Sequence, residues 1–148
     1  MADRRETVAL ADYAHRGAHW LDAPGLDADV ATEDDCLTLQ AAWLRSGVRL
    51  FVHAAKEGEL DARELAMLAA LRADAPRTLR QILFVLSQID QLADDAELDH
   101  VARAIQAQVE GLELHAVSAA RYRQGVEGGK RLLVQKSGVP ELRVLLAQ

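Results

Sequence analysis

The 148-residue sequence is poor in cysteine, aromatic residues and proline. Its single cysteine, Cys36, excludes a disulfide framework and a cysteine-based metal site. No apolar run approaches the ~18 residues that a membrane-spanning helix needs, and the polar N-terminus lacks the pattern of a secretory signal. We therefore expect a cytoplasmic protein without a membrane span.

Positive charge is also scarce. The chain has 17 Lys and Arg against 23 Asp and Glu, which leaves a net charge of −6. A nucleic-acid surface needs clustered Lys and Arg to neutralise phosphates. The one local cluster is better explained as a solvated loop-and-helix face, and it consists of Arg121, Arg123, Lys130 and Arg131. We therefore predict no nucleic-acid partner.

Aliphatic residues, by contrast, are abundant, since half of the residues are hydrophobic. At this length they suffice for one sizeable core, so residues 1–148 are interpreted as a single domain. Residues 1–16 form an N-terminal segment of uncertain structure. Within it, Thr7–Ala11 is predicted as helix rather than strand, because alanine and flanking charges favour a helix.

Apolar runs that begin near residues 18, 48, 82 and 112 alternate with amphipathic helical patterns. The run Gln81–Leu86 is typical of a strand buried on both faces. Helices are expected over about 32–45, from a capping box at Asp61–Glu64 to before Pro76, over 98–109, over about 127–136, and from Pro140 onward. This alternation predicts an α/β fold, with a mainly parallel sheet of about four strands and helices on both faces.

Ligands of open parallel sheets gather outside the carboxyl ends of the strands. The candidate residues there are Asp22 and Gly25 after the first strand, Ser87, Gln88 and Asp90 after the third, and Ser118 and Ala119 after the fourth. His53 ends the second strand and is predicted to be structural, because no second histidine or carboxylate has obvious ligand spacing. No carboxylate pair supports acid–base catalysis, so no catalytic residue is assigned.

In their order along the chain, three of these segments resemble motifs of the GTPases. Asp22-Ala23-Pro24-Gly25 resembles the Asp-x-x-Gly switch, in which the Asp leads to Mg²⁺ and the Gly amide meets the γ-phosphate. Ser87-Gln88-Ile89-Asp90 resembles the Asn/Thr-Lys-x-Asp element, whose Asp accepts hydrogen bonds from guanine N1 and N2. Here Gln88 replaces the Lys and Ser87 replaces the Asn or Thr. Ser118-Ala119 matches the Ser-Ala element, whose backbone amide approaches guanine O6.

The resemblance extends to the end of the chain. Ser137–Leu142 is similar to the start of the last helix of a GTPase, and the insertion before it resembles the layout of bacterial dynamin-like GTPases. The likeness covers residues 18–148. It implies a three-layer P-loop NTPase fold, a GTP or GDP ligand with Mg²⁺, Asp22 as the metal residue, and nucleotide contacts from the remaining candidate residues.

The phosphate-binding loop of that family is missing. The segment most similar to its sequence pattern is Gly125–Arg131, which has the wrong glycine spacing and no hydroxyl residue after Lys130. Losing three or four charged phosphate contacts and the Mg²⁺ ligand, at roughly 1.5–3 kcal/mol each, costs on the order of 5–8 kcal/mol, or about four to six decades of affinity. We therefore expect the C-terminal part of a dynamin-like GTPase domain whose own nucleotide binding is weak or absent. The alternative is a small α/β protein-interaction module without nucleotide.

The missing loop has a consequence for the sheet, because in the family its strand lies between the equivalents of strands 18–22 and 48–53. Without it, two apolar strands keep open edges. The two can pair directly, residues 7–11 can fill the gap, or another chain can. We expect direct pairing in a four-stranded sheet, with leftover apolar surface joining a second copy or the missing N-terminal half.

Overall fold

The computed structural model describes residues 11–15, 18–22, 47–78 and 81–147. The chain divides into two compact units, Met1–Arg49 and Leu50–Gln148. In the first unit, β1 (Ala11–His15) and β2 (Ala18–Asp22) form a two-stranded antiparallel sheet in which Tyr13 lies opposite Trp20. The connection between these strands is two residues long, which is the shortest common link between antiparallel strands.

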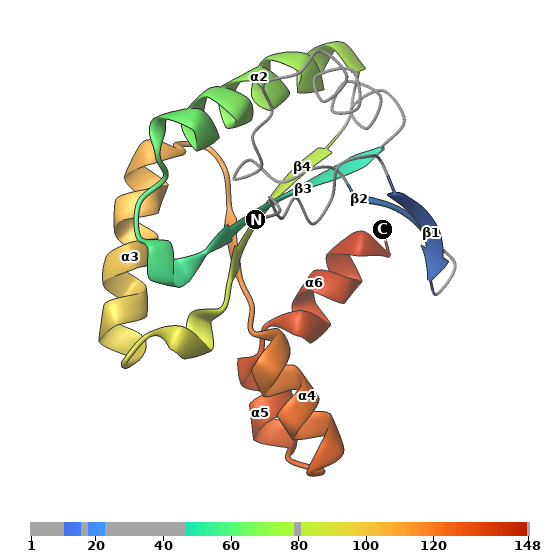
Figure 1. The fold of residues 1–148 in the computed structure, drawn as a ribbon, viewed down its shortest axis with the longest axis vertical. Helices are drawn as coiled ribbons and strands as arrows, with labels where there is room; N and C mark the ends of the chain where they lie inside the picture. Colours follow the sequence, from blue (N-terminus) through green and yellow to red (C-terminus); the bar gives the residue numbers. More distant parts are fainter. Residues whose placement is uncertain (1–10, 16–17, 23–46, 79–80, 148) are drawn as a thin grey trace, which may run out of the picture. The chain divides into compact units, whose positions relative to one another are not determined.

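The main sheet is parallel and has the strand order β3-β4-β5 (Figure 1). Its strands are β3 (Val48–Ala54), β4 (Gln81–Ser87) and β5 (Leu114–Ala116). Phe84 of β4 lies opposite Leu114 of β5, and Leu86 lies opposite Ala116. The α/β fold with a mainly parallel sheet is thereby confirmed.

Helices connect these strands in the expected alternation. The short η1 (Ala55–Glu57) and α2 (Ala62–Thr78) follow β3, and η2 (Ile89–Gln91) and α3 (Asp95–Gln108) follow β4. After β5 come α4 (Ala119–Glu127), α5 (Arg131–Lys136) and α6 (Val139–Leu146). Figure 1 shows α2 and α3 on one side of the sheet and α6 on the other.

The core lies between the sheet and the helices α2 and α3. The rings of Phe51 on β3 and Phe84 on β4 stack with centroids 5.5 Å apart. Leu68 of α2 and Ile105 of α3 are buried with them. Three of the buried residues of β4 are consecutive, Phe84, Val85 and Leu86, as expected for a strand covered on both faces.

The expected pairing of residues 18–22 with residues 48–53 in a four-stranded sheet is wrong for the described residues. Ala18–Asp22 pairs with Ala11–His15 instead, and the parallel sheet has three strands. The helix prediction is also wrong at Ala11, where a strand begins, because cross-strand pairing overrides the intrinsic helix propensity of alanine. Residues 7–10 and the helix expected at 32–45 lie outside the described residues.

Two helix boundaries also differ from expectation. Pro76 lies inside α2, in its last turn, rather than beyond it; there it removes only one hydrogen bond near the helix end. The helix expected over about 127–136 begins later, as α5 at Arg131; α4 already ends at Glu127, and Gly128 and Gly129, whose φ is 65°, lie between the two helices. The capping box is confirmed, since the Glu64 amide donates to Asp61 Oδ1 (2.9 Å) and the Asp61 amide donates to Glu64 Oε1 (3.2 Å).

Among the helices that the structure describes, none combines the length and the apolar character that crossing a membrane requires.

Candidate functional site

Two of the predicted segments meet at the carboxyl ends of β4 and β5. The Val117 amide donates to the Leu86 carbonyl (2.8 Å), which extends the strand pairing by one residue. The Ile89 amide then donates to the Val117 carbonyl (3.4 Å). These bonds hold the segment Ser87–Asp90 directly beside the segment Val117–Ala119, so the sheet itself brings the two motifs together.

The side chains of Asp90 and Ser118 form the centre of this site. The Ser118 hydroxyl donates to Asp90 Oδ1 over 2.7 Å. The same oxygen of Ser118 accepts the Arg121 amide (3.0 Å) and thereby caps the N-terminus of α4. Ser118 is fully buried, so its one proton is committed to Asp90.

These contacts keep Asp90 ionised. The hydrogen bond from Ser118 is the largest cause that lowers the pKa of this carboxyl below 3.8; the Gln91 side chain, the backbone amide and the Arg121 charge add to it, and burial opposes it. The Gln91 amide nitrogen donates to Asp90 Oδ2 over 3.0 Å. Asp90 is therefore an oriented, negatively charged acceptor that is partly exposed at the sheet edge.

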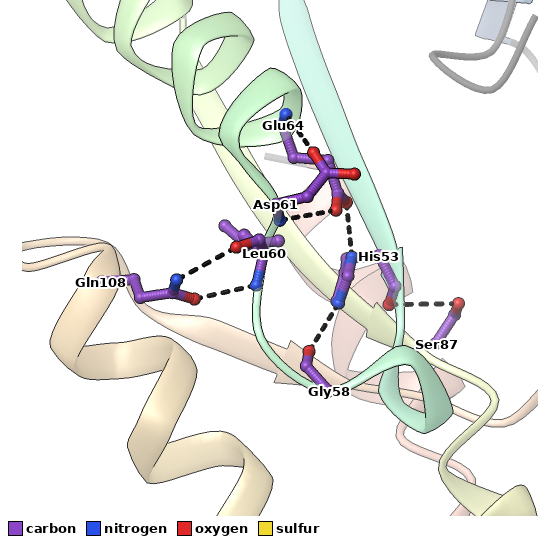
Figure 2. Close-up of polar contacts among 7 residues, drawn as sticks. All are labelled: His53, Gly58, Leu60, Asp61, Glu64, Ser87 and Gln108. Atoms are coloured by element: carbon purple, nitrogen blue, oxygen red, sulfur yellow. Dashed lines mark hydrogen bonds and ion pairs between the residues drawn. The ribbon is translucent and has the colours of Figure 1, made fainter.

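The other residues predicted in these two segments have distinct environments. Gln88 is exposed and has the left-handed backbone angles φ 56° and ψ 37°, and it is the one non-glycine residue with positive φ in the described part of the chain. The Ser87 hydroxyl donates to the His53 carbonyl (3.3 Å), so it ties β4 to β3 (Figure 2). Ala119 is the exposed first residue of α4, and the amides of a first helical turn have no partner within the helix.

The switch-like segment belongs to the first of the two compact units. Asp22 is the last residue of β2, opposite Ala11 in the first unit, and Gly25 lies outside the described residues. In the described ranges no group of three or more His, Cys, Asp or Glu side chains is arranged to hold a metal ion.

The sequence did not indicate that Ser137 and Gly138 pack against the Ser118 backbone and the end of β5. The Ser118 amide donates to the carbonyl of Ser137 (2.7 Å), and Ser137 is itself fully buried. The next residue, Gly138, has φ 73°, and a Cβ placed there would lie 2.0 Å from the Ala116 carbonyl oxygen. In the sequence, Ser137 and Gly138 indicate only a break before a helix, because no local pattern predicts their contacts with Ser118 and Ala116.

Comparison with solved structures shows the fold of a GTPase domain. Era, solved with MgGDPNP and a segment of 16S ribosomal RNA, superimposes with a TM-score of 0.57 at 18% identity, over 88% of this chain and 45% of Era. A variant of Era from Aquifex aeolicus, solved with GDP and AlF4⁻, gives the same TM-score and identity over 88% of this chain and 46% of Era.

No protein-family model matches the chain. The uncharacterized protein ACIAD1443 of Acinetobacter baylyi is 49% identical over 148 residues. The match covers 100% of this chain and 35% of that relative, so the chain spans about a third of the relative's length. These comparisons establish that the chain has the α/β fold of Era-type GTPase domains and that the match covers somewhat less than half of Era.

Proposed function

We propose that this chain is the base-recognising part of a GTPase-like domain and that Asp90 reads guanine. The observation that carries the proposal is the 2.7 Å contact between Ser118 and Asp90. It joins the two segments predicted from the sequence to face the base, and it holds the carboxylate ionised and oriented.

The chemistry of this acceptor suits guanine and not adenine. The Watson–Crick edge of guanine presents N1–H and N2–H as adjacent donors, which a carboxylate can accept with its two oxygens. Adenine presents an unprotonated N1 at the same place, and its lone pair repels the carboxylate. The N-terminal amides of α4, beginning at Ala119, are donors for the O6 oxygen of the same base.

The phosphate-binding part must come from other residues of a longer protein, since these 148 residues contain no Walker pattern. The relative in Acinetobacter baylyi, of which the chain covers 35%, has the length for such a part. For a longer protein that contains this chain, we further propose GTP hydrolysis and a dynamin-like parentage. In that protein Asp22 would bind Mg²⁺ and Gly25 would contact the γ-phosphate.

A base-only site makes a sharp prediction for the 148-residue chain. Guanosine, GDP and GTP should bind with equal affinity, in the millimolar range, because the phosphates find no partner. ATP should bind at least tenfold more weakly, since one charge-assisted hydrogen bond is worth roughly 1.5–3 kcal/mol. Ligand-observed NMR with each nucleotide measures these affinities directly.

The control for this titration is Asp90→Asn, which keeps the size of the side chain but replaces one acceptor oxygen by a donor group. It should remove the preference for guanine over adenine. A chain that binds GTP and ATP equally well would contradict the assignment of Asp90, and an unchanged preference in Asp90→Asn would do the same.

Gln91 is expected to compete with the base. Its side-chain amide donates to Asp90 Oδ2, one of the two oxygens that guanine would use. Removing the amide in Gln91→Ala should strengthen guanosine binding about two- to fivefold, because the contact is exposed and worth less than about 1 kcal/mol. The same titration measures it, with Gln88→Ala as the exposed neighbouring control. Weaker binding in Gln91→Ala would show that Gln91 assists the base.

One observation favours the second candidate, a protein-interaction module. Val48 and Val52 of β3 are 39% and 57% exposed, although the faces of parallel sheets are normally covered. Absence of any guanosine binding, together with self-association that Val52→Ser abolishes, would favour that candidate.

A further inference from the structure

The loop between β3 and α2 is held by a polar cluster that lies apart from the Asp90–Ser118 contact (Figure 2). Its centre is His53, which is 4% exposed at the carboxyl end of β3. The ring Nδ1 lies 2.5 Å from Glu64 Oε2 on α2, and Nε2 lies 2.8 Å from the Gly58 carbonyl oxygen in the loop. One imidazole therefore connects a strand, a loop and a helix.

The two partners of the ring are both acceptors. A carbonyl oxygen can only accept, and an ionised carboxylate can only accept, whereas a neutral imidazole has one N–H donor. Both contacts can be satisfied only if the pair holds one proton more than a neutral histidine and an ionised glutamate hold together. That proton lies either on His53, as an imidazolium, or on the Glu64 carboxyl.

The surroundings keep both partners in place. Glu64 Oε1 accepts the Asp61 amide in the capping box, so the carboxyl group cannot turn away without losing this bond. The Gln108 side chain of α3 bonds both the amide (2.9 Å) and the carbonyl (3.1 Å) of Leu60 in the same loop. Ser87 of β4 bonds the His53 carbonyl.

We propose that His53 and Glu64 share one proton that locks the loop Ala55–Leu60 onto the body of the domain, and that loss of this proton releases the loop. Without the proton the ring keeps one N–H and faces two acceptors. One contact then breaks, either at Gly58 in the loop or at Glu64 on α2. Because Ser87 begins the segment that leads to Asp90, the lock lies next to the candidate base site.

The groups around the ring come from four elements and from the loop between β3 and α2. Glu64 is the charged group that contacts the ring, and β4 and α3 present the neutral side chains of Ser87 and Gln108. The remaining charged residues come from β3, the loop and the start of α2, and they are buried Arg49 and exposed Lys56, Glu57, Glu59, Asp61 and Arg63.

The direction of the pH effect follows from the proton count. The folded state that makes both contacts holds the extra proton, and an unfolded chain makes neither contact. Stability therefore falls as pH rises through the range, about pH 5 to 8, in which imidazoles titrate. The unfolding equilibrium constant should rise about tenfold across this range, the equivalent of one charge-assisted hydrogen bond.

The experiment measures the protonation of His53 directly in the 148-residue chain. Proton–nitrogen NMR of the histidine rings should show, besides the Nε2 proton of His53, a second proton shared between Nδ1 and Glu64 at the acidic end of the range, and its loss at the alkaline end. In parallel, urea unfolding at each pH gives the stability. The variant Glu64→Gln keeps the capping acceptor but has no carboxyl group to share a proton, so it should remove the shared proton and flatten the pH slope. His100→Gln, on the exposed face of α3, is the matched control and should keep the slope.

A wild-type chain with no proton between His53 Nδ1 and Glu64 Oε2 at any pH in this range would overturn the proposal. So would a pH slope in Glu64→Gln as steep as that of the wild type. Both readings are independent of nucleotide, so they stand or fall separately from the proposed function.

Discussion

Replacing Gly138 by alanine is expected to lower the free energy of unfolding by about 3–5 kcal/mol, from a left-handed backbone and an overpacked contact of roughly 1–3 kcal/mol each. The glycine has φ 73°, and the added Cβ would lie 2.0 Å from the Ala116 carbonyl oxygen and 3.4 Å from Val117 Cα. Both neighbours are backbone atoms of the strand end that leads to Ser118, so they cannot turn aside as a side chain can. Urea unfolding monitored by circular dichroism measures the loss.

Gly129→Ala separates the two causes. Gly129 has a similar φ of 65°, but an added Cβ would meet nothing within 4 Å. This variant should therefore show the backbone cost alone, about 1–2 kcal/mol. Equal losses in the two variants would mean that α6 does not press on β5 as closely as the structure has it.

Ser118→Ala is expected to cost about 2–4 kcal/mol, because it removes a helix cap worth about 1 kcal/mol and a hydrogen bond to a charged group worth roughly 1.5–3 kcal/mol. The hydroxyl serves both the Arg121 amide and the Asp90 carboxylate. Urea unfolding at neutral pH measures the loss, and Ser87→Ala, whose hydroxyl makes one longer bond of 3.3 Å to a carbonyl, is the control.

The loss in Ser118→Ala should depend on pH in a defined direction. The folded pKa of Asp90 is lowered from 3.8, chiefly by Ser118. Because the folded pKa is lowered, the ionised carboxylate stabilises the folded state at pH values above 3.8. This contribution disappears as the pH falls through the folded pKa. The difference between wild type and Ser118→Ala should therefore shrink in acid. A difference that stays constant through this range would show that the hydroxyl acts as a helix cap alone.

The positions of Asp90 and Ser118 were predictable because parallel strands end at a common edge. Two apolar runs of the right length, each followed by polar residues, place those residues side by side whenever the strands are neighbours. The capping box at Asp61 and Glu64 was predictable for a similar reason, since its spacing of three residues acts within one helical turn. Both inferences use only short-range geometry.

The support of the site was not predictable in this way. Ser137 and Gly138 lie about twenty residues from Ser118 in the sequence, and their role depends on where α6 begins against β5. The pairing of His53 with Glu64 spans eleven residues and joins a strand to a helix across a loop. No periodicity or motif indicates either contact.

The sequence by itself determined the alternation of strands and helices, the parallel sheet and the two segments that meet at its edge, because hydrophobic periodicity and strand direction are local properties. Only the tertiary structure decided which strands pair, with Ala18–Asp22 turning back onto Ala11–His15 rather than joining β3. It alone also decided which polar groups are buried against one another. Those outcomes depend on contacts between segments far apart in the chain, where packing and hydrogen bonding outweigh local preference.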